Sequence, residues 1–213
     1  MGMGRREFLG LFASALAATT RAVALSDDLY VNRRLGLAFR KPAGWHFGDV
    51  KDMGEMAAGQ VFNFGAEAQA FWRSLLTTAD LPIVTVSKEP LGAKCDHFTP
   101  GITVFLDDFL DALDGPFTDQ AKNDVFYCSQ MLPEFRLLSP PQELEVSGCR
   151  AADYLIRFLF QHEQLAQPVP VNMRTINIYQ RPTSYNIRLY DAPYLGKDYV
   201  HDYSDFIASL RLA

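Results

Sequence analysis

The chain has 213 residues, of which 48% are hydrophobic and 13% aromatic, so its composition is that of a folded protein and excludes a disordered chain. Its 25 acidic residues outnumber its 20 lysines and arginines, which gives a net charge of −5. An acidic surface repels phosphate groups, so we expect no nucleic-acid partner.

The N-terminus resembles a twin-arginine export signal. Arg5 and Arg6 are followed, one residue later, by Phe8 and Leu9, although Gly10 stands where a lysine is more usual. Charge placed before an apolar stretch is the order that a signal peptide requires. We therefore interpret these residues as an export signal.

The residues after the arginine pair complete this pattern. The apolar run 11–18 is too short to span a bilayer comfortably, and Ala22 and Ala24 form a small-x-small cleavage site. Arg21 suits the twin-arginine route better than the general secretory route. We expect residues 1–24 to be removed. The loss of three arginines and one glutamate would change the net charge from −5 to −7.

Export would place the mature chain, residues 25–213, in a bacterial periplasm or, alternatively, a thylakoid lumen. No later stretch approaches the roughly 20 apolar residues of a membrane helix, so we do not expect an integral membrane protein after cleavage. Twin-arginine cargo is folded before export. A cofactor is therefore allowed but not required, and no motif predicts one.

The three cysteines, Cys95, Cys128 and Cys149, would lie in an oxidising compartment. We favour a disulfide between Cys128 and Cys149, which would close about 20 residues and contribute roughly 3 kcal/mol. The alternative is that all three are small buried hydrophobic residues. Their spacing does not suit zinc, so no metal site is predicted.

In the first half of the mature chain, alternating apolar residues and turn residues predict strands and helices in mixed order. A turn at 41–45 would return Trp45 to the core. Residues 102–113 fit a strand that gives way to a helix near Asp107. The expected strands are 36–39, 60–64 and 82–87, and the expected helices are 66–76 and 118–132. The last helix has Thr118 as N-cap and an inward stripe of Ala121, Val125, Cys128 and Leu132.

The second half predicts an antiparallel meander followed by a helix. Two short strands, 136–139 and 143–147, would flank Pro140 and Pro141. Longer strands are expected at 149–161, 172–180 and 185–190, with a hairpin connection at 181–184. The helix 199–210 would place Tyr203, Phe206, Ile207 and Leu210 on one face. With no linker or repeat in the chain, a single α+β domain over residues 25–213 is the simplest interpretation.

This order of elements resembles the PsbP-like superfamily. Two motifs support this resemblance. One is the opening strand with its Pro42-x-Gly44-Trp45 turn, and the other is the closing strand 185–189, which precedes a helix that ends in 206–210. The resemblance implies an antiparallel sheet sandwiched by helices, an α/β/α sandwich. It also implies binding or assembly roles, since members include an extrinsic photosystem II subunit and a Ran-binding nuclear protein. Residues 48–81 depart from the pattern as an insertion.

The candidate binding residues come from strand alternation. Arg157 lies on the polar face of one strand, and Arg188 with Tyr190 on the polar face of another. If the strands are neighbours, these residues share a face with Asn177 and Tyr179. Two guanidiniums among tyrosines suit a carboxylate, a phosphate or an acidic segment. The alternative is an ordinary polar sheet face with salt bridges.

No catalytic motif is present, so no catalytic residue is assigned. Cys95 and His97 with the intervening Asp96 could bind a metal, but neighbouring residues of an extended chain point in different directions. We therefore favour a non-catalytic accessory protein that binds an envelope or membrane-associated protein complex. The alternative is a small-molecule-binding protein or enzyme that uses the Arg/Tyr face.

Overall fold

The computed structural model describes residues 23–48, 52, 56, 59–63, 82–90, 97–107, 117–180, 183–196 and 199–213. The chain divides into two compact units: a smaller one of residues 1–44, 146–149 and 198–213, and a larger one of residues 45–145 and 150–197. The predicted export signal up to residue 22, the predicted helix 66–76, Cys95 and the helix predicted after Asp107 lie outside the described residues. Within the described ranges, no helix combines the length and the apolar character that crossing a membrane requires.

The smaller unit contains a four-stranded antiparallel sheet and the helix α5, Val200–Ser209. The strand order is β1-β2-β3-β12. The strands are β1 Val23–Leu25, β2 Leu29–Asn32, β3 Leu37–Arg40 and β12 Arg211–Leu212. Ala24 of the predicted cleavage site pairs with Val31 of β2. The predicted strand 36–39 and helix 199–210 are confirmed with small shifts of their ends.

Aromatic side chains make the core of this unit. The Phe39 ring stacks on Tyr30 at 5.0 Å between centroids and meets Phe206 of α5 edge-on at 4.9 Å. The Ser209 hydroxyl accepts a 2.9 Å hydrogen bond from the backbone N–H of Arg40. Helix α5 is therefore joined to β3 by both apolar and polar contacts.

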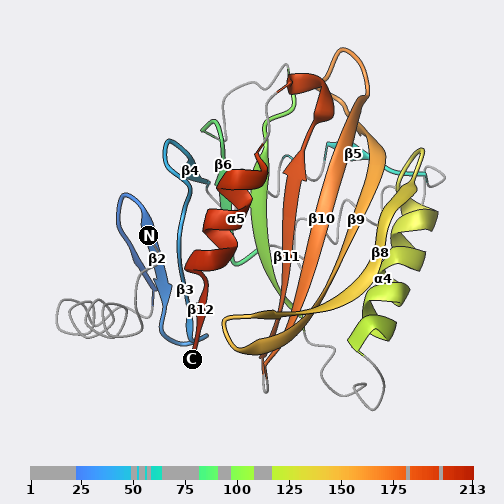
Figure 1. Ribbon diagram of the computed structural model, residues 1–213. Coiled ribbons are helices and arrows are strands. Elements are labelled where there is room, and N and C mark those ends of the chain that lie inside the picture. The colour runs from blue at the N-terminus through green and yellow to red at the C-terminus, as the bar shows by residue number, and fades with distance from the viewer. Residues whose placement is uncertain are drawn as a thin grey trace. The chain divides into compact units, whose positions relative to one another are not determined.

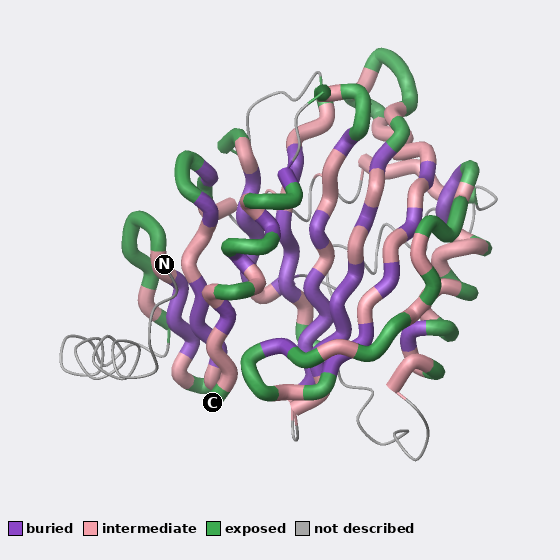
Figure 2. Tube along the Cα trace, in the orientation of Figure 1, coloured by how far each residue is buried: buried purple, intermediate pink, exposed green. Residues whose placement is uncertain are grey.

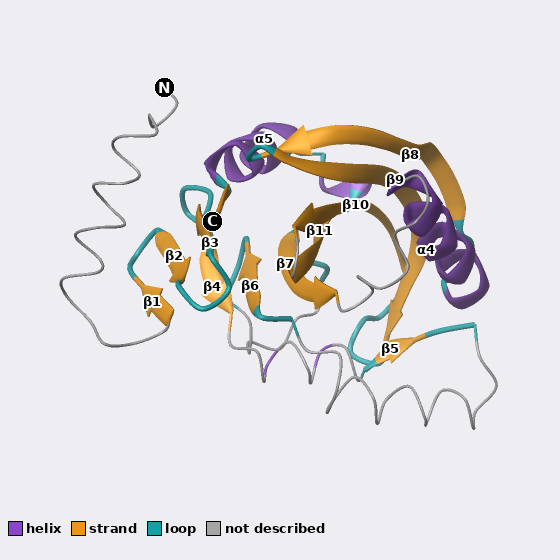
Figure 3. Ribbon diagram, turned by 90° about the horizontal axis from the view of Figure 1, so that it is seen from below, coloured by secondary structure: helices purple, strands orange, loops and turns teal. Residues whose placement is uncertain are grey.

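The larger unit is an eight-stranded antiparallel sheet with strand order β4-β6-β7-β11-β10-β9-β5, and β8 pairs with β9 beside this path. Its strands are β4 His46–Gly48, β5 Gln60–Val61, β6 Val84–Ser87, β7 Gly101–Asp107, β8 Arg136–Val146, β9 Cys149–His162, β10 Val169–Gln180 and β11 Thr183–Asp191. Figure 3 shows how the sheet curves from β7 through β11 and β10 to β9, as expected of twisted strands. A short 3-10 helix, η2, Pro193–Leu195, follows β11.

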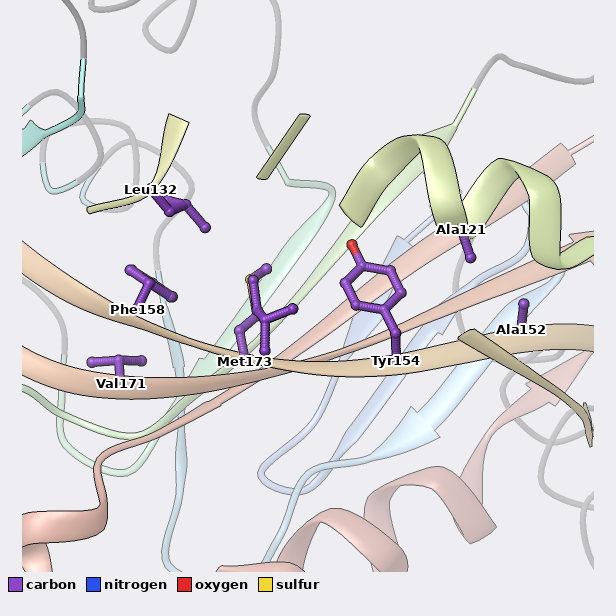
Figure 4. Close-up of a cluster of buried hydrophobic side chains, with 8 residues drawn as sticks. Ala121, Leu132, Ala152, Tyr154, Phe158, Val171 and Met173 are labelled. Carbon is purple, nitrogen blue, oxygen red and sulfur yellow. The ribbon is translucent and has the colours of Figure 1, made fainter. Parts of the chain in front are cut away.

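Helix α4, Phe117–Met131, packs on one face of this sheet beside β8 and β9 (Figure 1). Ala121 and Leu132 meet a cluster of buried side chains from β9 and β10, with Tyr154 standing up from β9 toward the helix (Figure 4). The other sheet residues of the cluster are Ala152, Ile156, Phe158, Val171 and Met173. Val125 and Cys128 pack against the same cluster, which confirms the predicted stripe.

The central strands are buried along much of their length, as the purple segments of Figure 2 show, and side chains on the face opposite α4 are among the buried ones. Ile102, Ile176, Ile178 and Ile187 are each fully buried. Since both faces of the central strands exclude water, the register of these strands is strongly specified. An α+β fold with antiparallel sheets is confirmed. The arrangement as a single α/β/α sandwich stays a prediction.

Two local predictions were wrong. Residues 136–146 form one continuous strand, β8, although two short strands around Pro140 and Pro141 were expected. In the described residues β8 pairs only with β9, and an edge strand tolerates proline because half of its N–H groups need no partner strand. Helix α4 begins at Phe117, so Thr118 lies inside the helix rather than at its N-cap.

The predicted disulfide is also absent, because Cys128 and Cys149 are both free thiols. Cys128 on α4 lies close to Tyr154 of β9, whereas Cys149 is the first residue of that strand. Five strand residues correspond to about 16 Å, far beyond the distance that a disulfide can span. Spacing along the chain could not reveal this offset.

Candidate binding face around Arg188

The face of the larger sheet on which α4 packs changes from apolar to polar across the strands. On β9 it presents Ala152, Tyr154, Ile156 and Phe158, which are buried. On β11, two strands away, the same face presents the polar side chains Ser184, Asn186, Arg188 and Tyr190. The apolar half holds α4, and the polar half is the candidate site.

Four of the five predicted binding residues share this face. Thr175 of β10 lies opposite Arg188 of β11, and Asn177 lies opposite Asn186. Because side chains alternate along each strand, Asn177, Tyr179, Arg188 and Tyr190 all project from one face of neighbouring strands. Their predicted role in binding stays a prediction, but their common location is as expected.

Arg157 does not belong to this group. It lies opposite Asn172 of β10, one residue out of phase with Thr175, and so projects from the other face of the sheet. Its Nε donates a 2.8 Å hydrogen bond to Asn172 Oδ1. The prediction that Arg157 and Arg188 share a face was therefore wrong. β10 lies between β9 and β11, and the register of both pairings sets the outcome.

A chain of hydrogen bonds runs from Arg188 across two asparagines to α4. Arg188 Nε donates to Asn186 Oδ1 at 2.9 Å, and Asn186 Nδ2 donates to Asn177 Oδ1 at 2.7 Å. Asn177 Nδ2 then donates to Asp124 Oδ2 at 2.7 Å. Both asparagines are buried, at 7% and 1% exposure, so these bonds are shielded from water. The two amides hold Arg188 and Asp124 apart instead of letting them form an ion pair.

Arg188 has an unusual environment for a cation. Its guanidinium lies over the Phe105 ring, 4.6 Å from the centroid, and no carboxylate of the described residues forms an ion pair with it. Burial acts to lower the pKa of Arg188, but Tyr190, Tyr154 and Cys128 together outweigh it and raise the pKa above its ordinary value. The side chain is therefore charged at neutral pH.

Three threonines lie in a row with Arg188 across the sheet, and two of them are its direct neighbours. Thr103 of β7 and Thr175 of β10 lie directly opposite Arg188 on either side, and Thr85 of β6 lies opposite Thr103. All three are at most 2% exposed, and their hydroxyls have no well-formed hydrogen bond with any residue that the structure describes. Thr175 lies beside the Tyr154 hydroxyl, which completes the row on β9. Unpaired buried hydroxyls are costly, which makes this Thr/Arg row a candidate ligand site.

The helix side of the site contributes a thiol and a carboxylate. Burial raises the pKa of the Cys128 thiol, while the charge of Arg188 opposes this shift. Burial, followed by Cys128 and Asp124, raises the pKa of Tyr154 well above its usual range. Both groups are neutral at neutral pH, so Cys128 does not have the lowered pKa of a reactive nucleophile.

Tyr179 lies at the end of this face and anchors the start of α4. Its hydroxyl donates to the Phe117 carbonyl at 3.4 Å, and the two rings are 4.6 Å apart. Arg150 lies over the Phe117 ring at 3.7 Å from its centroid. These contacts give Tyr179 a structural role in seating the helix.

Comparison with solved structures assigns the architecture. The solution structure of cyanobacterial PsbP from Synechocystis is 15% identical and aligns over 92% of this chain and 99% of that chain with a TM-score of 0.53. The chain has the PsbP-like fold. No protein-family profile and no curated protein matches the sequence.

Two other solved structures resemble this PsbP-like chain more distantly. A protein of unknown function from Pseudomonas aeruginosa is 19% identical over 56% of this chain and 73% of that chain, with a TM-score of 0.40. LpqN, involved in cell envelope biogenesis of Mycobacterium tuberculosis, is 11% identical over 83% of each chain, with a TM-score of 0.42. At these TM-scores neither likeness supports an argument about function.

The sequence missed the threonines, Asn186 and Asp124 as members of the PsbP-like chain's candidate site. A partial signal for Thr85 and Thr103 was present, since each is a polar residue between two apolar neighbours in its strand. Nothing local shows that Thr103 lies beside Arg188 or that Thr85 lies beside Thr103. Of the metal site considered at Cys95, Asp96 and His97, only His97 lies within the described residues. Its Nε2 is 2.8 Å from Glu89 Oε2. No cluster of metal-ligating side chains occurs within the described ranges.

Proposed function

We propose that this protein is an exported, non-catalytic accessory protein that binds another protein in the bacterial periplasm. The PsbP-like fold over 92% of the chain carries the proposal, because the roles implied by that resemblance are mostly binding and assembly. A fold by itself does not select a function. A surface feature is needed to say where a partner would bind.

Two neighbouring aromatic side chains on α4 supply this feature. Phe126 and Tyr127 are 61% and 63% exposed, and their rings meet edge-on at 5.8 Å between centroids. Exposed aromatic residues are enriched where proteins meet, since they bury a large area at a low cost in side-chain entropy. The helix that carries them is fixed on the sheet by its buried stripe. We therefore place the protein-binding surface on the outer side of α4.

Site-specific photo-crosslinking in the native cell tests this surface. A photoreactive residue at position 126 should capture the same envelope protein in repeated experiments, and Tyr127→Ser should reduce the yield severalfold. Val200 on α5 is equally exposed, at 61%, and provides the matched control position. Capture at both positions, or at neither, would contradict the proposal.

Export is a separate part of the proposal, supported by the order of Arg5, Arg6 and the small residues Ala22 and Ala24. Replacing both arginines with lysine should leave uncleaved protein in the cytoplasm. N-terminal sequencing of the wild-type protein should begin at Leu25. Full-length protein with Met1 retained in the cytosol of wild-type cells would refute this interpretation. Recovery of the protein from a thylakoid lumen would show that it is exported there and not to a periplasm.

A second candidate function is the binding of a small molecule at the Thr/Arg row. The specific observation in its favour is that the buried hydroxyl of Thr103, directly beside Arg188, and that of Thr85 next to it have no hydrogen-bond partner among the described residues. This candidate is independent of the α4 surface, and the protein could carry both functions. Titration with small polar molecules, followed by NMR spectroscopy, tests it directly. If none of these molecules perturbed the NMR signals of the residues around Arg188, this second candidate function would be rejected.

A further inference from the structure

We propose that the Thr/Arg row binds an oxyanion, either the carboxylate or the phosphate of a small ligand. This inference rests on the second candidate function and adds the chemical class of the ligand. Its parts are the Arg188 guanidinium, as the charged group, and the hydroxyls of Thr103 and Thr175, as neutral donors, with Thr85 next to Thr103 at the edge of the site. All four side chains come from consecutive strands of one unit, β6, β7, β11 and β10.

The register places these donors within reach of one small ligand. Residues directly opposite each other in antiparallel strands have Cβ atoms about 4.5–5.5 Å apart. Thr103 and Thr175 therefore flank Arg188 closely on both sides, and Thr85 is one strand further from Arg188. Thr85 is two strand spacings, about 10 Å, from Arg188, so it borders the site and does not contact the same small ligand.

The orientation of Arg188 leaves donors for a ligand. Nε donates to Asn186, Tyr190 also forms a hydrogen bond with the side chain, and one face of the guanidinium is occupied by the Phe105 ring. Stacking on a ring leaves the in-plane N–H groups able to donate, and the planar fork matches the oxygens of a carboxylate or phosphate. Of the four side chains, Arg188 alone keeps partial solvent exposure, whereas the three threonines are at most 2% exposed.

The charge balance favours an anion over a neutral ligand. Asp124 is the carboxylate joined to this site, and it is separated from Arg188 by the side chains of Asn177 and Asn186. A partly desolvated guanidinium without an adjacent carboxylate gains more from an anion than an exposed one does, because the surroundings screen less. Hydroxyl groups that lack acceptors can turn their protons toward the same oxygens.

The opposite face of the sheet shows what an ordinary ionic pair looks like in this protein. There Arg174 donates to Asp153 through Nε at 2.8 Å and through Nη2 at 2.5 Å. Arg188 has a different arrangement, in which its neighbours orient it and none of the described carboxylates forms an ion pair with it. This contrast argues against a purely structural salt bridge as the purpose of Arg188.

The test uses the mature chain, residues 25–213, and three probes: acetate, inorganic phosphate and the neutral analogue acetamide. Each is titrated at constant ionic strength maintained with sodium chloride, and NMR spectroscopy follows the Arg188 Nε–H and the Asn186 side-chain amide. We expect saturable shifts with acetate or phosphate and none with acetamide. The anion with the lower dissociation constant identifies the ligand class.

Variants separate binding from folding. Arg188→Gln should weaken the anion at least tenfold, since a charged hydrogen bond is lost. Thr103→Val should weaken it about threefold or more while keeping or raising the melting temperature, because the hydroxyl that it removes has no partner. Arg157→Gln, on the opposite face, is the matched control and should leave the affinity unchanged.

Each other outcome overturns the inference in a distinguishable way. Equal shifts with acetamide and acetate would reject an anion but keep a small-molecule site. Absence of saturable shifts with all three probes would reject both the anion and the second candidate function. Anion binding that Arg157→Gln weakens as much as Arg188→Gln would place it elsewhere on the protein. None of these results affects the crosslinking test on α4.

Discussion

The pair of buried asparagines offers a sharp test of the hydrogen-bond chain behind Arg188. Leucine has nearly the shape of asparagine but no polar atoms, so Asn→Leu removes hydrogen bonds with little change in volume. Asn186→Leu leaves Arg188 Nε and Asn177 Oδ1 without their partners. Asn177→Leu removes the acceptor of Asn186 Nδ2 and the hydrogen bond that Asp124 Oδ2 accepts from Asn177.

The size of the effect follows from how many groups lose their partners. A buried polar group without a partner costs about 1–3 kcal/mol, and part of this is offset by the transfer of leucine out of water. We expect each single variant to lose about 2–4 kcal/mol of unfolding free energy. The double variant removes both partners of the central bond, so it should lose about 2 kcal/mol less than the sum of the singles.

Urea unfolding of the mature chain and of the three variants, followed by circular dichroism, measures this double-mutant cycle. The slope of free energy against urea concentration should be the same for all four proteins, which shows that the unfolding reaction is unchanged. Additive losses, within about 0.5 kcal/mol, would show that the two asparagines are not coupled. The chain from Arg188 to Asp124 would then not exist as described.

Two further predictions concern stability. Gly36 has φ +66°, and a Cβ at this position would lie 2.4 Å from the backbone oxygen of Ala213. Gly36→Ala should therefore lower the free energy of unfolding by about 2–3 kcal/mol, measured with urea, and loosen β12. An unchanged stability would contradict this contact. The pKa values of Cys128 and Tyr154 are raised, so the folded state keeps both protons to a higher pH than the unfolded chain does. The free energy of unfolding should therefore fall as the pH rises above about 9. Tyr154→Phe should reduce that fall, and an identical pH profile would refute the shift.

Local patterns predicted much of the fold. The apolar stripe of α4, the alternation in β9 and β11, and the turn before Trp45 all followed from the sequence, because side-chain periodicity depends only on neighbouring residues. The β8 strand shows where local rules mislead. Pro140 and Pro141 suggested a break, yet an edge strand accommodates them because its outer N–H groups need no partner.

The candidate site was only partly predictable. Alternation showed correctly that Arg188 and Tyr190 share a face of their own strand. It could not show that Arg157 projects from the other face, since that depends on which strand lies between and on the register of two pairings.

The amino-acid sequence alone thus determined the faces of single strands and of α4, since a period of two or of 3.6 residues is a property of the local backbone. The tertiary structure decided which strands are neighbours, and therefore which strand faces form one common surface. Thr103 lies beside Arg188 because β7 pairs with β11, which is far away in the chain, and Thr85 lies beside Thr103 because β6 pairs with β7. A shift of one residue in such a pairing would turn every side chain to the opposite face, and no local pattern specifies that shift.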